Sequence, residues 1–197
     1  MKRIGLTGGI GSGKSTLAGM LCDMGVPVLD LDALGRELHG DADCRAALLA
    51  AFGDGILDAA GEVDRTVLGR LCFADADKTA TLNRIMHPRI WQQEQAWIAS
   101  QSAPCVLIEA SVLIESGGVA RMDAVVVVLA DMERRRLRVE RQRSMGPEHF
   151  DAIVARQCSD DARRAAADYI IENNAGLDAL QQQAADLHRW LLALSRA

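Results

Sequence analysis

Aromatic residues and lysine are scarce in this sequence. Aromatic side chains make up 4% of its 197 residues, so we expect a core built mainly from Leu, Ile, Val, Ala and Met. Lysine occurs only at positions 2, 14 and 78. No apolar run approaches the roughly 20 residues that a membrane-spanning helix needs, and glycines interrupt the apolar N-terminus at once. We therefore expect neither a signal peptide nor membrane insertion.

Positive charge is also in deficit, because the formal net charge is −5. This balance argues against general nucleic-acid binding and against polybasic attachment to a membrane surface. The five cysteines are odd in number and lack C-x-x-C spacing, which makes a zinc site or a disulfide framework a poor explanation. Reduced thiols in a cytoplasmic protein explain them more simply.

Short apolar runs alternate with longer helical patterns along the chain. A run at 4–6 enters a glycine-rich loop, a helix follows from Lys14, and a second run at 26–29 completes a strand–helix–strand unit with parallel strands. The buried face of this helix is expected to consist of Leu17, Met20, Leu21 and Met24. Further strands are expected at 106–108, 125–129 and 169–171.

The glycine-rich loop, Gly8–Ser15, reads G-G-I-G-S-G-K-S and matches the pattern G-x-x-x-x-G-K-[ST] of a phosphate-binding loop. Its glycines allow the backbone to approach phosphate closely, and its amides form an anion cradle at the positive end of the next helix. Lys14 is expected to reach the β- and γ-phosphates of ATP, and the Ser15 hydroxyl is expected to bind Mg²⁺. A chance match is the alternative, but the preceding strand and the following amphipathic helix favour a true phosphate loop.

This order of elements predicts an α/β fold of the P-loop NTPase type, with a mostly parallel five-stranded sheet flanked by helices. We expect one domain over residues 1–197 that carries two helical inserts. These inserts cover residues 33–100 and 134–164.

Acidic residues follow two of the expected strands. Asp30 and Asp32 come after the run at 26–29, at the sheet edge where ligands bind in open parallel sheets. We expect Asp32 to accept the proton of an acceptor hydroxyl, and capping of the next helix is an equally good explanation. Glu109, with Glu115 shortly after it, is expected to hold Mg²⁺ through water, unless it is an ordinary polar strand end.

Arginines crowd the segment 134–143, and His87 precedes a proline in the first insert. Most of these arginines are expected to lie on a solvated helix face with i,i+4 ion pairs. One or two of them would instead bring positive charge onto the transferring phosphate. A single histidine is more often structural, so the pattern alone assigns no role to His87.

Four motifs resemble the dephospho-CoA kinase family. Residues 4–16 resemble its extended phosphate-loop signature, and 28–32 resembles its V-I-D-A-D segment. Residues 85–90 resemble its L/I-x-H-P-x-I segment, and 167–174 resembles its A-D-Y-V-I-D-N-N segment. Gln157 and Arg163 fall where the family has a glutamine and a basic residue. Glu109 stands where the family has Asp, and 111–115 departs from its P-L-L-F-E.

The resemblance implies ATP-dependent phosphorylation of the ribose 3′-hydroxyl of dephospho-CoA, the last step of coenzyme A biosynthesis. It implies that the insert at 33–100 binds the acceptor and that the insert at 134–164 forms a mobile lid. The implied catalytic residues are Asp32 as the base, Lys14, and a lid arginine, Arg143 with Arg141 as the fallback. Thr7, Asp32 and His87 are the expected acceptor contacts. The expected ATP contacts are Gly9, Gly11, Ser12, Gly13, Lys14, Ser15, Thr16 and Asn174, the last approaching the adenine. The chain would work as a monomer or a small homo-oligomer.

Two other functions compete with this interpretation. A kinase for nucleosides, nucleotides or shikimate would share the phosphate loop but not the segments around Asp32 and His87. A nucleotide-dependent switch is a different class, and its guanine motif N-K-x-D is absent from this sequence.

Overall fold

The computed structural model describes residues 1–73, 75–143 and 145–195, without the side chains of Phe73 and Arg143. The chain divides into two compact units, one formed by Met1–Asp30 with Gln101–Ala197 and the other by Leu31–Ser100. Among the described residues, no helix is both long and apolar enough to cross a bilayer.

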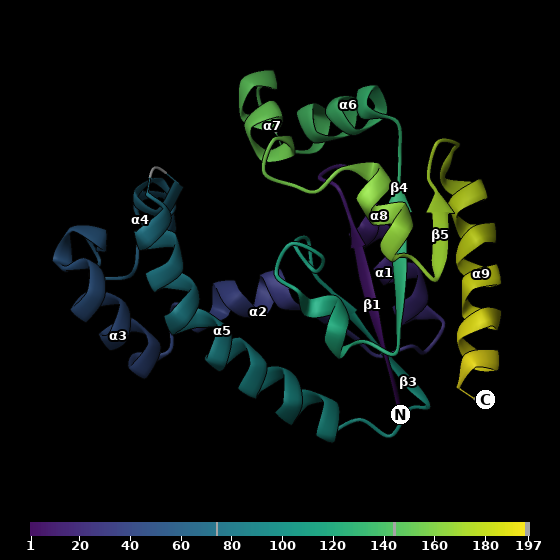
Figure 1. The fold of residues 1–197 in the computed structure, drawn as a ribbon, viewed down its shortest axis with the longest axis horizontal. Coiled ribbons are helices and arrows are strands. Elements are labelled where there is room, and N and C mark those ends of the chain that lie inside the picture. Colours follow the sequence, from purple (N-terminus) through teal and green to yellow (C-terminus); the bar gives the residue numbers. More distant parts are fainter. Residues whose placement is uncertain (74, 144, 196–197) are drawn as a thin grey trace. The chain divides into compact units, whose positions relative to one another are not determined.

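The first unit is built on a five-stranded sheet in which every pairing is parallel (Figure 1). All five expected strands are present, so the predicted α/β fold with a parallel sheet is confirmed. The sheet has the order β2-β3-β1-β4-β5, and β3 and β4 are buried at every position. Its strands are β1 (Lys2–Gly8), β2 (Val28–Asp30), β3 (Cys105–Glu109), β4 (Ala124–Leu129) and β5 (Tyr169–Glu172).

Helices α1 (Lys14–Asp23) and α9 (Leu177–Leu194) complete the core of this unit. Leu17 and Leu21 of α1 pack with alternate residues of the central strands and with Leu187 of α9. The expectation for Met24 is wrong, since this side chain is 37% exposed. The helix ends at Asp23, which leaves Met24 past its last turn as the cap residue.

Four further elements of the first unit lie in the connections between its strands. The 3₁₀ turn η2 (Gly118–Arg121) precedes β4, and α6 (Met132–Arg143), α7 (Pro147–Val154) and α8 (Asp160–Ala166) lie between β4 and β5. Ile10 of the phosphate loop packs against Val139 of α6 and Phe150 of α7, so the loop and these two helices share a small apolar cluster. Pro147 starts α7, as expected for a residue that needs no amide partner in the first turn.

The second unit is helical. Leu48, Ile56, Leu68 and Met86 are among the residues that form its own buried core. Asp75 caps α5 by accepting hydrogen bonds from the amides of Asp77 and Lys78. Its elements are α2 (Leu31–Leu38), α3 (Ala42–Phe52), η1 (Asp54–Ile56), α4 (Arg65–Phe73) and α5 (Ala76–Ala99).

Candidate active site

The phosphate loop connects β1 to α1 at the centre of the sheet. β1 lies between β3 and β4, so the chain leaves the sheet here at the point where the strand order reverses. Ligands of open α/β sheets bind outside the carboxyl ends of strands at such a switch point. Gly11 and Gly13 adopt left-handed backbone angles, with φ of 74° and 100°, which residues with a Cβ rarely adopt. Lys14 opens α1 and is 8% exposed, while Thr16 in the same turn is exposed.

Ser15 and Glu109 form a hydroxyl–carboxylate pair beside the loop. The Ser15 Oγ donates a hydrogen bond of 2.7 Å to Glu109 Oε1. Glu109 ends β3, where the strand register places it opposite Leu6 of β1 and Asp30 of β2. Hydroxyl and carboxylate oxygens are hard ligands of the kind that Mg²⁺ prefers, so the chemistry of this pair fits a magnesium ion that arrives with a nucleotide.

Asn173 and Arg138 hold the outer side of the loop, and the sequence did not single out either residue. The Asn173 Nδ2 donates to the Ser12 carbonyl at 2.7 Å, and it occupies the space that a Cβ at Gly13 would need. Arg138 donates to the Ser12 carbonyl at 3.3 Å and to the Asn173 carbonyl at 2.8 Å. Burial, followed by the charge of Arg134, lowers the pKa of the Arg138 guanidinium.

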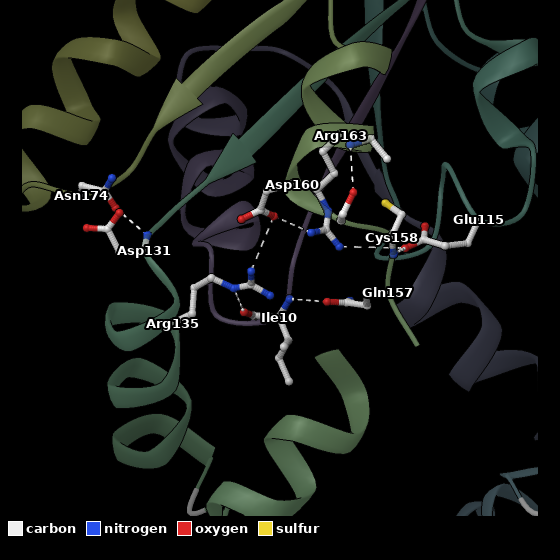
Figure 2. A network of polar contacts seen from close by, with 11 residues as sticks. Ile10, Glu115, Asp131, Arg135, Gln157, Cys158, Asp160, Arg163 and Asn174 are labelled. Carbon is white, nitrogen blue, oxygen red and sulfur yellow. Dashed lines mark hydrogen bonds and ion pairs between the residues drawn. The ribbon is translucent and has the colours of Figure 1, made fainter. Parts of the chain in front are cut away.

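Asn174, expected beside the adenine, joins two loops at the same edge of the sheet. Its Oδ1 accepts a hydrogen bond of 2.8 Å from the Asp131 amide just before α6, as Figure 2 shows. Asn173 and Asn174 are neighbours in the chain, and no spacing rule separates the one that braces the loop from the one that links β5 to α6. A contact between Asn174 and adenine stays a prediction.

Gln157 and Arg163, which the family resemblance marked, belong to a polar network behind the loop (Figure 2). The Gln157 Oε1 accepts a hydrogen bond of 3.0 Å from the Ile10 amide. Arg163 has a side chain that is 3% exposed, and it lies 3.9 Å from Glu115 Oε1. The same Glu115 oxygen accepts a 2.8 Å hydrogen bond from the Cys158 amide. Glu115 therefore anchors the connection into α8. Its partners, the Cys158 amide and Arg163, give this carboxylate a structural role.

A cavity of about 250 Å³ lies within the second unit, between α2 and α5. Asp32 and His87 both line it, so the structure brings these two predicted acceptor residues together. Burial, followed by the charge of Arg65, lowers the pKa of His39, which also faces this cavity. Asp32 lies in the first turn of α2, where a negative side chain also stabilises the helix by interacting with the positive end of its dipole. Its roles as base and as helix-stabilising residue are therefore both compatible with this position.

The remaining predicted residues are distributed as follows. Thr7 is buried in β1, paired in register with Val127 of β4. Arg141 is exposed on α6, and the side chain of Arg143 lies outside the described residues. The arrangement of the lid arginine therefore stays a prediction.

A phosphate loop at the switch point of a parallel sheet, with a hydroxyl–carboxylate pair at the start of its helix, defines a P-loop nucleotide-binding protein. Solved structures share this fold. A protein from Thermus thermophilus superposes with a TM-score of 0.88 at 31% identity, covering 96% of this chain and 97% of that one. A shikimate kinase from Acinetobacter baumannii shares the fold alone, with a TM-score of 0.55 at 20% identity over 98% of this chain and 94% of that one.

The family is narrower than the class. Residues 2–179 match the sequence pattern of the dephospho-CoA kinase family. The dephospho-CoA kinase of Rhizobium meliloti is 39% identical over 91% of this chain and 93% of that protein. The one from Thermobifida fusca is 37% identical over 95% of this chain and 94% of that protein. The chain belongs to the dephospho-CoA kinase family.

Proposed function

We propose that this chain transfers the γ-phosphate of ATP to the ribose 3′-hydroxyl of dephospho-CoA, giving coenzyme A. The observation that carries the proposal is the family match over residues 2–179, in a fold that presents a complete phosphate loop. The phosphate loop supports a phosphoryl donor, and the family supports this particular acceptor.

In the donor site, Gly9–Thr16 would surround the phosphates of ATP. Lys14 would balance charge on the β- and γ-phosphates from its position at the start of α1. Mg²⁺ bound with ATP would be held by Ser15, with Glu109 accepting from its hydration shell, and it would neutralise charge on the phosphate oxygens. Asn174 would lie against the adenine.

In the acceptor site, Asp32 would accept or orient the proton of the attacking hydroxyl. His87, which lines the same cavity, and Thr7 would contact the acceptor. A cavity of about 250 Å³ holds only a part of a ligand as large as dephospho-CoA, since drug-sized ligands occupy about 300–1,000 Å³. The rest of the acceptor would be bound by other parts of the insert at 33–100. Residues 134–164 would form a lid that brings Arg143, or else Arg141, onto the transferring phosphate.

The state of assembly and the location in the cell stay predictions: a monomer or small homo-oligomer, in the cytoplasm. All five cysteines are free, which fits a reducing compartment.

A coupled assay of ADP release with MgATP tests the proposed function. Dephospho-CoA is compared with adenosine, AMP and shikimate as acceptors, and shikimate is included because a shikimate kinase shares the fold. We expect ADP release with dephospho-CoA alone. Turnover with another acceptor only would keep the class and discard this acceptor. Tight ATP binding without turnover on any acceptor would favour a nucleotide-dependent switch.

A further inference from the structure

Both backbone groups of Ile10, in the middle of the phosphate loop, are held by side chains from distant segments. The Ile10 amide donates to Gln157 Oε1 at 3.0 Å, and the Ile10 carbonyl accepts from Arg135 Nε at 2.8 Å. Figure 2 shows the two side chains approaching Ile10, Arg135 from α6 and Gln157 from the connection between α7 and α8. Side-chain hydrogen bonds therefore hold the loop at both polar backbone groups of Ile10.

The hydrogen bond to the Ile10 carbonyl also sets the direction of the next amide. In a trans peptide the C=O of one residue and the N–H of the next lie in one plane and point in opposite directions. Because the Ile10 carbonyl is turned outward to Arg135, the Gly11 amide is turned the other way, toward the inner side of the loop. Inward amides are what a phosphate loop offers to its anion. Through this hydrogen bond, Arg135 holds the peptide unit that carries the Gly11 amide.

Arg135 is itself fixed with little freedom. Its side chain is 2% exposed, and its Nη1 lies 3.7 Å from Asp160 Oδ1 at the start of α8. Asp160 also pairs with Arg163 at 2.6 Å, so a single carboxylate serves two buried guanidinium groups. Burial lowers the pKa of Arg135, and the charge of Asp160 partly offsets this effect. A buried guanidinium stays charged and requires such a partner.

The close approach of Arg135 depends on two loop glycines. A Cβ on Gly9 would overlap the Arg135 Nη2, and a Cβ on Gly11 would lie 2.5 Å from the Arg135 carbonyl oxygen. Nη2 is buried and has no hydrogen-bond partner among the described residues. Both the side chain and the backbone of Arg135 therefore pack closely against the loop.

We propose that Arg135, held by Asp160, is a positioning residue of the phosphoryl-donor site, which orients the Ile10–Gly11 peptide so that the loop keeps its phosphate-binding shape before nucleotide arrives. The inference rests on the proposed function only in that the loop binds a nucleoside triphosphate. It assigns Arg135 to the framework of the donor site, although the sequence places it within the predicted lid.

The test compares Arg135→Met, Arg135→Lys and Asp160→Asn with a matched control, Arg136→Met. Arg136 is the next residue of α6, but it pairs with Asp151 at 2.7 Å and is about half exposed, at 47%. For each variant, binding of ADP and ATP is measured by calorimetry without acceptor. The KM values for ATP and dephospho-CoA, the kcat and the melting temperature are measured alongside.

We expect Arg135→Met to weaken nucleotide binding and raise the KM for ATP about tenfold, the effect of losing one hydrogen bond to a charged group. The KM for dephospho-CoA should change by less than about twofold, because the substitution leaves the contacts with the acceptor in place. Asp160→Asn should shift the same parameters in the same direction by a smaller factor. Arg135→Lys, which keeps the charge and one donor, should recover part of the loss, and Arg136→Met should match the wild type.

A purely structural role predicts a different pattern, in which melting temperatures fall while nucleotide affinity and the KM for ATP stay at wild-type values. That pattern would overturn the inference. If Arg135→Met does not fold, Asp160→Asn and Arg135→Lys decide the question by the same parameters. Failure of the wild type to phosphorylate dephospho-CoA would refute the proposed function, and the nucleotide affinities would still decide the role of Arg135.

Discussion

Two alanine substitutions at glycines of the same segment are expected to act in opposite directions. Gly11 lies in the phosphate loop with φ of 74°, and Gly19 lies in the middle of α1. A Cβ on Gly11 would meet the Arg135 carbonyl oxygen at 2.5 Å and Val139 Cγ2 at 2.9 Å. Around Gly19 no atom lies within 4 Å of the added Cβ, outside its own helix and neighbours. The pair therefore separates the loss of glycine from the loss of space.

The magnitudes follow from these surroundings. An alanine held in the left-handed region costs about 1–2 kcal/mol, and forcing a methyl group against packed backbone costs about 1–3 kcal/mol. We therefore expect Gly11→Ala to lower the free energy of unfolding by about 2–5 kcal/mol. Gly19→Ala should raise it by about 0.5–1 kcal/mol, because alanine loses less backbone entropy than glycine in a helix.

Urea unfolding followed by far-ultraviolet circular dichroism measures both free energies, and titration with ADP measures the loop. Gly11→Ala should also lose nucleotide affinity, since relief of the clash requires the loop to move away from α6. Gly19→Ala should bind ADP as the wild type does. A Gly11→Ala variant with wild-type stability and affinity would refute the close packing of α6 on the loop.

Three further predictions concern single carboxylates. Asp32→Asn should lower kcat by about 100-fold or more, the usual contribution of a general base, while ADP affinity stays unchanged; retained turnover would exclude Asp32 as the base. Glu109→Gln should raise the Mg²⁺ concentration for half-maximal turnover by about tenfold, as expected when the partner of a metal ligand is lost; an unchanged Mg²⁺ titration would contradict this role. The backbone hydrogen bonds from Lys78 and Asp77 lower the pKa of Asp75, the α5 cap. Asp75→Ala should therefore lower the melting temperature at pH values above the usual pKa of aspartate, about 3.9, and the difference should disappear as the pH falls below the folded-state pKa; a difference that persists in acid would show that the cap does not act through its charge.

The strands were predictable from the sequence because their burial is uniform. An uninterrupted apolar run such as 125–129 fits a parallel strand covered on both faces, and β4 is buried throughout. The boundaries were less accurate. β1 begins at Lys2, two residues before its apolar run, because Lys2 and Arg3 pair with β3 through backbone groups alone. A backbone ladder does not require apolar side chains, so hydropathy cannot mark its end.

The roles of the arginines were not predictable from their number. Arg135 and Arg138 lie on the same face of α6 as Val139, which is buried at 2% exposure. The spacing i, i+3, i+4 around a single apolar residue was the signal available. Without the loop in place, however, it could not show that this face covers the loop carbonyls rather than solvent.

Two separate requirements therefore call for glycine in the phosphate loop of this chain. Phosphate requires a backbone that can approach closely from the inner side, and α6 requires the same of the outer side at Gly9 and Gly11. Even if no nucleotide were bound, a Cβ on Gly11 would clash with the backbone of Arg135, and a Cβ on Gly9 would displace the Arg135 guanidinium. The shape of the loop is thus set by helix packing before ligand binding, which lowers the entropy that binding must otherwise remove.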